Sequence, residues 1–317
     1  MTQSQAKSRI EKLKTEIRHH GYLYHVLDRQ EISDAAWDSL KYELKKLEEQ
    51  FPELITADSP TQRVAGTALA KFQKIKHKVR QWSFNDGFSL AEIEEWEQRN
   101  KNILKAQEES NSQNNKDRMN YVCELKIDGL HIVLTYRQGV LKTAATRGDG
   151  LIGEDVTQNI KTIGSIPLRL RQSVDVIAEG EIWMAKDVLA KLNQEQEKKG
   201  LPKFANPRNA AAGSIRQLDP RVAAERQLDS FIYDLVYFNN QGIKTLPATQ
   251  LAELKLLQDL GFKVNQHYQL CQNLEAVSAY IKKWENRREK ENYWLDGVVI
   301  KASQRKLQEK LGYTGKA

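Results

Sequence analysis

Apolar residues recur at helical spacing through the first fifty residues of the chain. They form two series, one with Ile10, Leu13, Ile17 and Tyr24 and the other with Trp37, Leu40, Leu44 and Leu47. Apolar positions three or four residues apart make one face of an amphipathic helix, so the pattern predicts two paired helices. Ser33 or Asp34 can cap the second helix, and Pro52 lies just past its end. We therefore expect a small helical unit at the N-terminus.

A turn-rich stretch, residues 58–66, follows this unit and predicts a linker. Beyond it, strands are expected near residues 121–126, 131–137, 139–146, 174–184, 230–237 and 296–302, and helices near 186–199, 248–260 and 273–289. Ser89 and Glu92 form a capping box that opens a further helix, and residues 105–118 have so little to bury that they predict a surface loop. This order favours an α+β fold with antiparallel sheets flanked by helices, divided into residues 1–68 and 69–317.

Length and composition limit the class of protein. With 317 residues and 40% hydrophobic content, the chain can bury one sizeable core and a small accessory unit. Cys123 and Cys271 are far apart, which favours a reducing compartment over a disulfide framework. No apolar run approaches the length of a membrane span, and the first twenty residues lack the apolar core of a signal peptide. We therefore expect a cytoplasmic protein with no membrane partner, and we expect it to be a monomer.

The net charge of +7 belongs to the larger part of the chain. The first 68 residues hold ten Lys and Arg against eleven Asp and Glu, whereas the rest holds 39 against 31. A run of cations follows the linker, at Lys71, Lys74, Lys76, Lys78 and Arg80. Such a run attracts the phosphates of nucleotides or nucleic acid, although a solubilising surface is the simpler explanation from charge alone.

Lys126 stands at the end of a predicted strand, within residues 124–129 (Glu-Leu-Lys-Ile-Asp-Gly). The flanking segments are rich in strand formers, and Gly129 marks the break between them. A lysine at such a turn can face a ligand, but as a nucleophile it needs neighbours that lower its pKa or accept its proton, and Asp128 is the nearest acid. Lys-x-Asp-Gly alone is expected by chance in roughly one chain in fifteen, so a structural lysine stays the alternative.

Further cations can join Lys126. Arg147 closes the hairpin that begins at Lys126, and we expect it at the same sheet edge. Arg208 and Arg216 lie eight residues apart around a run of small residues, and both face one side if that stretch is helical. Lys301 ends a second strand. Cations that converge on one nucleotide are typical of phosphoryl or nucleotidyl transfer.

Residues 123–129 (Cys-Glu-Leu-Lys-Ile-Asp-Gly) resemble motif I of the covalent nucleotidyltransferases, which include DNA ligases, RNA ligases and capping enzymes. The wider pattern is similar to that of bacterial NAD-dependent DNA ligases. It comprises residues 22–25 with Asp34 and Asp38, then residues 58–64, 145–150, 204–216 and 296–301. The resemblance implies a helical domain for nicotinamide mononucleotide over residues 1–68 and a nucleotidyltransferase (ATP-grasp-like) domain over residues 69–317.

The resemblance also implies a three-step reaction. Lys126 attacks the α-phosphorus of NAD, expels nicotinamide mononucleotide and becomes linked to AMP. The AMP then passes to the 5′-phosphate of nicked duplex DNA, and the 3′-hydroxyl displaces it to seal the strand. NAD, as the AMP donor, and Mg²⁺ are the implied cofactors, with no metal ligands assigned in this chain.

Individual roles carry over from the family's motifs. Glu124 matches the acid that reads the adenine amino group, Ser83 and Phe84 lie at the adenosine pocket, and Arg147 and Glu181 match ribose and phosphate contacts. The positive groups around the phosphates are Arg208, Arg216, Arg288 and Lys301. Lys126, Asp128 and Lys301 are the implied catalytic residues.

In the helical domain, Tyr24, His25, Asp34 and Asp38 match the surface that grips nicotinamide mononucleotide. Structural roles stay open for several of the matched residues. His25 can be a partly buried helix histidine and Asp34 an N-cap, while Glu181 can be a surface acid and Lys301 a solvated strand end. The two arginines around the small residues can pair with Asp219.

Four residues depart from the family's pattern. Trp37 stands for a tyrosine, His131 for a small residue, Phe84 for an aliphatic residue and Glu179 for an arginine. The chain also ends before the last lysine-containing motif. We expect it to be a truncated adenylation region without the oligonucleotide-binding, zinc, helix-hairpin-helix and terminal domains, so that zinc belongs to the missing part and nick sealing is not expected.

Two other interpretations stay open. An ATP- or GTP-using ligase or capping enzyme is the alternative within the superfamily. A non-catalytic NAD- or DNA-binding module derived from a ligase is the alternative of a different class. A dehydrogenase is disfavoured, because no Gly-x-Gly-x-x-Gly turn follows a predicted strand.

Overall fold

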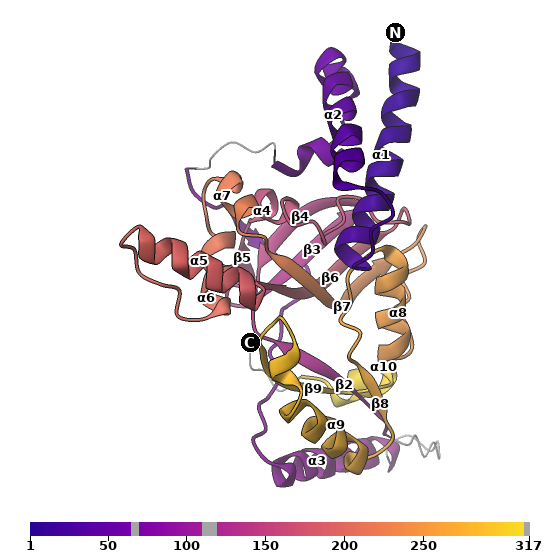
Figure 1. Cartoon of the computed structure of the whole chain (residues 1–317). Coiled ribbons are helices and arrows are strands. Elements are labelled where there is room, and N and C mark those ends of the chain that lie inside the picture. The colour runs from indigo at the N-terminus through magenta and orange to yellow at the C-terminus, as the bar shows by residue number, and fades with distance from the viewer. Residues whose placement is uncertain (65–69, 110–118, 314–317) are drawn as a thin grey trace.

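A computed structural model describes residues 1–64, 70–109 and 119–313. A pair of long helices stands at one end of a body that is built from antiparallel sheets and flanking helices (Figure 1). The expected boundary after residue 68 lies outside the described residues, as do residues 65 and 66 of the expected linker. Within the described ranges, no helix is long and apolar enough to cross a membrane.

The two predicted N-terminal helices are confirmed as α1 (Gln3–Val26) and α2 (Asp34–Gln50). They pack through the buried residues Ile10, Leu13, Ile17, Leu44 and Leu47. Tyr24 and Trp37, which share the helical periodicity, lie outside this core, and Tyr24 is exposed. Of the two N-cap candidates, Ser33 caps α2 through its side-chain oxygen, and Asp34 is the first helical residue. Two 3₁₀ helices follow, η1 (Pro52–Leu54) and η2 (Pro60–Val64).

Two main antiparallel sheets form the body, and all six predicted strands are present in them. The larger sheet has the order β4-β3-β6-β7, formed by Val140–Thr146, Leu130–Arg137, Asp175–Trp183 and Asp229–Asn239. The smaller sheet has the order β8-β2-β9, formed by Gln269–Cys271, Tyr121–Ile127 and Leu295–Ala302. A separate ladder joins β1 (Lys74–Lys76) to β5 (Ile152–Glu154). The strands β1, β5 and β8 were not predicted, because three residues are too few to show alternation.

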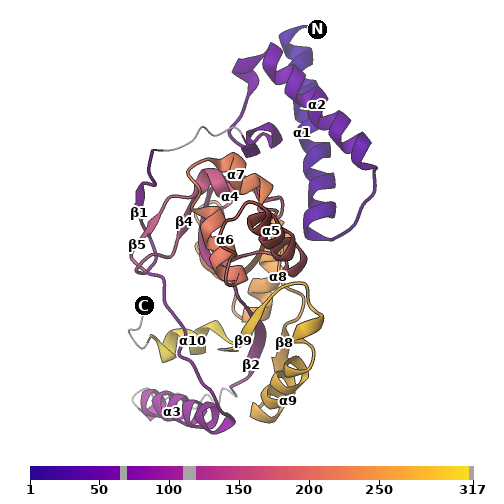
Figure 2. The same cartoon turned by 60° about the vertical axis from the view of Figure 1, so that its left-hand side comes forward.

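Helices flank the two main sheets (Figures 1 and 2). On the larger sheet they are α4 (Thr157–Lys161), α5 (Lys186–Lys198), α6 (Pro207–Ile215) and α8 (Gln250–Leu260), whose buried residues share one core with it. The short α7 (Pro220–Glu225) packs beside α4. On the smaller sheet they are α3 (Leu90–Glu109), α9 (Leu274–Glu285) and α10 (Arg305–Leu311), which form a second core with β2. The short helices α4, α7 and α10 were not predicted.

Three details of the helix predictions were wrong. The predicted loop over residues 105–118 is helical as far as Glu109, and its residues 110–118 lie outside the described ranges. The predicted helix over 273–289 ends at Glu285 and is followed by the 3₁₀ helix η3 (Arg288–Lys290). At the start of α3, Ser89 does accept from the N–H of Glu92, but the Glu92 carboxylate binds the N–H of Phe88, one residue earlier than a capping box requires.

Strand alternation gathers polar side chains between the two sheets. Even-numbered residues of β3 and β6, such as Ile132 and Ala178, are buried in the core of the larger sheet. His131, Glu179 and Glu181 therefore lie on the opposite face. On β2, odd-numbered residues are buried in the second core, so that Glu124 and Lys126 share the other face with Lys301, which is opposite Val122 on β9.

The helical pair docks on the body through buried charged groups. Arg63 donates to the carbonyl oxygens of Lys161, Ile163 and Ile166 at 3.0, 2.9 and 3.1 Å. Burial lowers the pKa of Arg63 to about 10, so its guanidinium stays charged at neutral pH. Asp58 accepts from Arg18 at 2.7 Å and from Arg169 across the interface. Burial disfavours the charged Asp58, but the hydrogen bonds from Arg169 and Thr56 lower its pKa to about 2.

We expect Arg63→Met to destabilise the protein by about 3 kcal/mol, since it removes three charge-assisted hydrogen bonds and leaves their carbonyl acceptors unpaired. Urea unfolding followed by circular dichroism measures this change. Arg99→Met is the control, because Arg99 makes an exposed i,i+4 pair with Glu95 and should cost less than about 1 kcal/mol. Equal unfolding curves for the two variants would contradict the role given to Arg63.

Candidate active site

Lys126 lies at the end of β2, where the chain crosses to the larger sheet. A Cβ on Gly129 would lie 2.2 Å from the carbonyl oxygen of Ile182, so only glycine allows the turn to pack this closely on β6. The close approach brings the Lys126 end of β2 beside the Glu181 region. Lys126 is partly exposed, and its ammonium pairs with the carboxylate of Asp296 on β9. The predicted position of Lys126 at a strand end that faces other functional groups is therefore confirmed.

Asp296 contacts the Lys126 ammonium, and Asp128 interacts electrostatically with Lys126, Asp296 and Arg208. Burial raises the pKa of Asp128, and repulsion from Asp296 raises it further, while Arg208 and Lys126 act in the opposite direction. Arg208 belongs to the first turn of α6, whose N-cap Asn206 accepts a hydrogen bond from the N–H of Asn209. Helix α6 thus supplies a cation, Arg208, that offsets the negative charge of Asp128.

Glu124 and Lys301 form a buried ion pair, with 2.9 Å between Oε1 and Nζ. Lys301 also donates to the carbonyl oxygen of Tyr233 at 3.2 Å, and its ammonium lies 5.4 Å from the centre of the Tyr233 ring. Burial disfavours the charged lysine, but Glu124 and Asp234 raise its pKa. The alternative that Lys301 is a solvated strand end is therefore wrong.

Glu181, His131, Tyr233 and Glu179 line the facing sheet. Glu181 is directly opposite His131 in the β3–β6 register and accepts from the Tyr233 hydroxyl at 3.4 Å. Burial raises the pKa of Glu181 to about 7, against the opposing effects of His131, Arg208 and Lys126. His131 and Glu179, noted above as departures, contact each other, with 3.2 Å between Nε2 and Oε2. Glu181 is thus an inward-facing acid, not a surface one.

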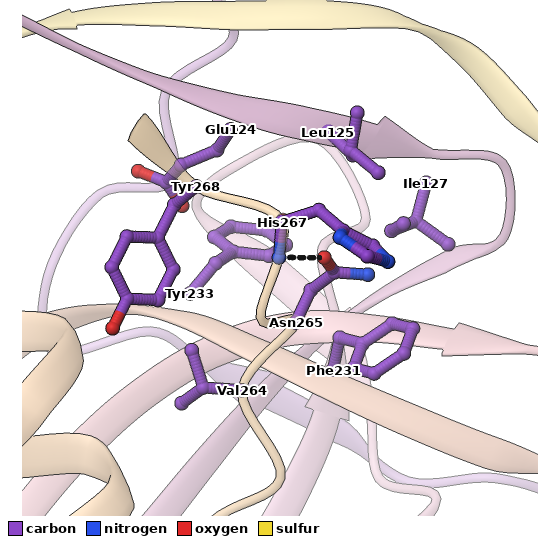
Figure 3. Close-up of a pocket in the computed structure, with 9 residues that line it drawn as sticks. All are labelled: Glu124, Leu125, Ile127, Phe231, Tyr233, Val264, Asn265, His267 and Tyr268. Carbon is purple, nitrogen blue, oxygen red and sulfur yellow. Dashed lines mark hydrogen bonds between the residues drawn. The ribbon is translucent and has the colours of Figure 1, made fainter. Parts of the chain in front are cut away.

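A small cavity of about 20 Å³ opens between the two sheets (Figure 3). Glu124 and Leu125 enter it from β2, Phe231 and Tyr233 from β7, and His267 from the connection before β8 (Figure 3). The volume is enough for about one water molecule. The cavity is therefore too small to hold a nucleoside.

Arg147 does not share a sheet edge with Lys126, contrary to the prediction. It follows β4 of the larger sheet, whereas Lys126 ends β2 of the smaller sheet, because the β2–β3 segment crosses between sheets instead of forming a hairpin. Arg147 donates to the Ser83 hydroxyl at 2.8 Å, so these two predicted residues do lie together. Phe84, the next residue, is exposed.

Arg216 and Arg288 form their ion pairs with residues outside the group of Lys126, Asp128, Asp296 and Arg208. Arg216 caps the end of α6 and pairs with Glu154 of β5 at 3.1 Å. The alternative that it pairs with Asp219 is wrong, since Asp219 binds Arg221. Arg288 is exposed in η3 and pairs only loosely, at 3.7 Å, with its neighbour Glu289.

The four residues expected to grip nicotinamide mononucleotide gather on the helical pair. The rings of Tyr24 and His25 contact the Trp37 ring at tilted angles. The Asp34 carboxylate accepts a hydrogen bond from Gln30, and Asp38 forms an ion pair with Lys41. None of the hydrogen bonds, ion pairs or ring contacts among the described residues joins these four to the Lys126 cluster, and the helical pair lies apart from β2 and β9 (Figure 2). The two predicted parts of the site are separate in this structure.

His25 is held against the body. A Cβ on Gly164 would lie 2.5 Å from the imidazole, so the ring rests directly on the glycine backbone. Burial and the nearby Arg63 lower the pKa of His25 to about 4, so the ring is neutral at pH 7. His25 is therefore partly buried, as its structural alternative required, and its contact with nicotinamide stays a prediction.

Two residues of the site were missed from the sequence. Asp296 pairs with Lys126, and a signal for it existed, because Asp296-Gly297 opens β9 next to the point where Asp128-Gly129 leaves β2. Tyr233 contacts Glu181, Lys301 and His131, but an aromatic residue in an alternating strand gives no functional signal. Both are candidates for ligand contact.

One group of three side chains within the described ranges has the spacing to bind a metal ion. His19, His20 and Glu31 place ligand atoms within 4.8 Å of one another on the helical pair, away from Lys126. Arg29 already pairs with Glu31 at 2.9 Å. Near Lys126, Asp128 and Asp296 are the carboxylates that could hold a cation.

The two-sheet body carries lysines on adjacent strands, each paired with a carboxylate, and this arrangement suits a nucleotidyltransferase. Family models agree: residues 69–317 match the NAD-dependent DNA ligase adenylation domain, and residues 3–65 match the DNA ligase-like, N-terminal NAD+-binding domain. The chain belongs to the family of NAD-dependent DNA ligases and carries its adenylation domain.

Curated relatives agree with this assignment. Proteins described as DNA ligase are 47% identical over 308 residues in Thermotoga petrophila, 44% over 314 in Syntrophomonas wolfei and 44% over 317 in Bacillus thuringiensis. These matches cover 97%, 99% and 100% of this chain, but only 43%, 45% and 45% of the relatives. The chain therefore spans less than half the length of these relatives.

Glu181 should make stability fall as pH rises. The pKa of Glu181 is 4.5 in the unfolded chain and about 7 in the folded protein. Between these pH values the folded state therefore holds a proton that the unfolded chain has lost. We expect a loss of about 2 kcal/mol between pH 5 and pH 8 that is absent in Glu181→Gln. Urea unfolding of both proteins at the two pH values measures it.

The exposed Glu94→Gln serves as the control, and it should leave the pH dependence of the wild type unchanged. If Glu181→Gln and the wild type lose the same stability between pH 5 and pH 8, Glu181 does not have a raised pKa.

Proposed function

We propose that this chain is the adenylation part of an NAD-dependent DNA ligase, in which Lys126 takes AMP from NAD. The observation that carries the proposal is the setting of Lys126, which is partly exposed at a strand end and paired with Asp296 beside Arg208. Membership of the family supports it independently.

In the proposed step, Lys126 Nζ attacks the α-phosphorus of NAD. A phosphorus–nitrogen bond forms, the bond from the α-phosphorus to the bridging oxygen breaks, and nicotinamide mononucleotide leaves with that oxygen. The amine attacks only without its extra proton, and Asp296 is the acceptor already in contact with it. Asp128 and Asp296 together hold the amine toward the phosphate.

The charged side chains favour one orientation of the nucleotide within the site. Arg208 and Lys126 mark the end that attracts phosphate, and the same electrostatic attraction neutralises charge as the phosphate reacts. Glu124, Glu179 and Glu181 mark an acidic end, which suits the amino and hydroxyl groups of adenosine. Glu124 would exchange part of its contact with Lys301 for the adenine amino group. Arg147 and Ser83 close the ribose side, Arg216 and Arg288 add positive charge farther out, and Lys301 adds it beside Glu124.

Mg²⁺ fits the acidic pair near Lys126. Burial and the repulsion between Asp128 and Asp296 raise the pKa of Asp128, and a cation between the carboxylates would relieve that repulsion. When bound, the ion would neutralise phosphate charge and favour the uncharged amine. Asp128 and Asp296 are the residues that would hold it.

The helical pair would bind the other half of NAD. Tyr24, His25, Asp34 and Asp38 offer an aromatic and acidic surface for nicotinamide mononucleotide. Since His25 rests on Gly164 and Asp58 binds Arg169, the pair would leave this docking surface to bring nicotinamide mononucleotide toward Lys126. The docking contacts are mostly polar, so water can replace them.

The AMP would serve to seal 3′-hydroxyl/5′-phosphate nicks in duplex DNA, a proposal supported by the relatives that are described as DNA ligase. The run Lys71, Lys74, Lys76, Lys78 and Arg80 is exposed and can contact DNA phosphates. We place the enzyme in the cytoplasm as a monomer.

Incubation of the chain with NAD and Mg²⁺ should add one adenylate, because Lys126 is the nucleophile. Intact-mass measurement should show this adduct on the wild type and none on Lys126→Ala. Lys142→Ala is the matched control, since Lys142 is an exposed strand lysine of β4 and should not affect the yield.

An adduct that persists on Lys126→Ala would overturn the assignment of the nucleophile. An adduct formed from ATP but not from NAD would instead favour the ATP-using alternative. If the wild type binds NAD but forms no adduct under any condition, the chain is a binding module.

A further inference from the structure

The two ring nitrogens of His131 have different environments. Nε2 lies 3.2 Å from Oε2 of Glu179, and the side chains of the pair are 19% and 10% exposed. Nδ1 is buried and has no hydrogen-bond partner among the described residues. A buried polar atom without a partner costs about 1–3 kcal/mol, and such atoms are rare in folded proteins. This one lies within the candidate active site.

Glu179 determines which nitrogen of His131 carries the proton. A carboxylate only accepts hydrogen bonds, so Nε2 must donate. In the neutral ring Nδ1 is then an acceptor, and in the charged ring it is a donor. A hydroxyl group can satisfy Nδ1 in either state, because it both donates and accepts.

The acids that face His131 disfavour an anionic partner for Nδ1. Glu179 binds its ring, and Glu181 is directly opposite it across the β3–β6 register. Glu124 and Asp234 also place negative charge in this region, where they raise the pKa values of Lys301 and Tyr233. A phosphate group beside these acids would be repelled, whereas a neutral sugar hydroxyl would not. The cations Lys126 and Arg208 act on both Glu181 and Asp128, and phosphate is favoured beside them.

We propose that Nδ1 of His131 binds a ribose hydroxyl of the adenosine part of the nucleotide, and that Glu179 is a positioning residue which holds the ring in the required tautomer. This inference rests on the proposed function and adds a specificity contact to it. The family resemblance assigns no role to either position, since both depart from its pattern, and the structure shows that the two departures contact each other. The contact selects a ribonucleotide over a deoxyribonucleotide.

The test is calorimetric binding of AMP, 2′-deoxy-AMP and 3′-deoxy-AMP to the chain, since AMP occupies the adenosine site without reacting. The wild type should bind AMP roughly tenfold more tightly than one of the two deoxy analogues, the value of one such hydrogen bond. The analogue that binds more weakly identifies the hydroxyl.

Two substitutions distinguish the roles of the two ring nitrogens of His131. The amide of His131→Asn lies near the place of Nδ1, whereas the amide of His131→Gln reaches the place of Nε2 and can still bind Glu179. We expect His131→Asn to keep the preference for AMP within about threefold, and His131→Gln to bind AMP roughly tenfold more weakly and to lose the preference. Thermal melting of both variants checks that they fold.

Glu179 is tested in the same way. Glu179→Gln keeps an oxygen that accepts from Nε2 and should retain the preference for AMP, whereas Glu179→Ala should lose it. A purely structural role for the pair would change melting temperature in these variants without changing the ratio of affinities for AMP and its deoxy analogue.

The inference is overturned if His131→Gln discriminates between AMP and both deoxy analogues as the wild type does. It is also overturned if the wild type binds all three equally. Wild-type protein that binds neither AMP nor NAD would overturn the proposed function as well, so the two failures are distinguishable.

Discussion

The buried ammonium of Lys301 joins the two main sheets, and the site depends on it. Lys301 is on β9 and Glu124 on the adjacent strand β2, while the carbonyl that completes the ammonium's contacts belongs to Tyr233 of β7 in the other sheet. A buried ammonium without partners would cost several kcal/mol, so the sheets must approach closely enough for the Tyr233 carbonyl to complete its contacts. Since β2 carries Lys126 two residues beyond Glu124, this contact also determines where the proposed nucleophile lies.

Charge is divided along the space between the sheets. Acids gather where β2, β3, β6 and β7 approach one another, and this end holds the small cavity and the His131–Glu179 pair. Lys126 precedes the turn at Gly129 and its amine pairs with Asp296, while Arg208 acts on the nearby Asp128. A nucleotide has the same division, with a neutral nucleoside and an anionic phosphate. This correspondence gives the nucleotide one favoured orientation, with its phosphate at the lysine.

Local features of the fold and the site could be predicted from the sequence, and long-range ones could not. The six longer strands, the helical pair and the strand-end position of Lys126 follow from periodicity and turn residues. The division of β2 and β3 between two sheets does not, because Asp128-Gly129 is equally compatible with a tight hairpin, and the position predicted for Arg147 was wrong for this reason. The pairing of His131 with Glu179 likewise depends on strand register, which joins residues 48 positions apart.

The central claim is that the nucleotide lies between the sheets with its α-phosphorus at residue 126. A crystal structure of Lys126→Ala with NAD tests it most directly, because this variant cannot consume the ligand. We predict adenine beside Glu124, a ribose hydroxyl at His131, and the α-phosphorus within reach of a lysine at position 126. Adenosine bound elsewhere, or phosphate at the acidic end beside Glu179 and Glu181, would contradict the account.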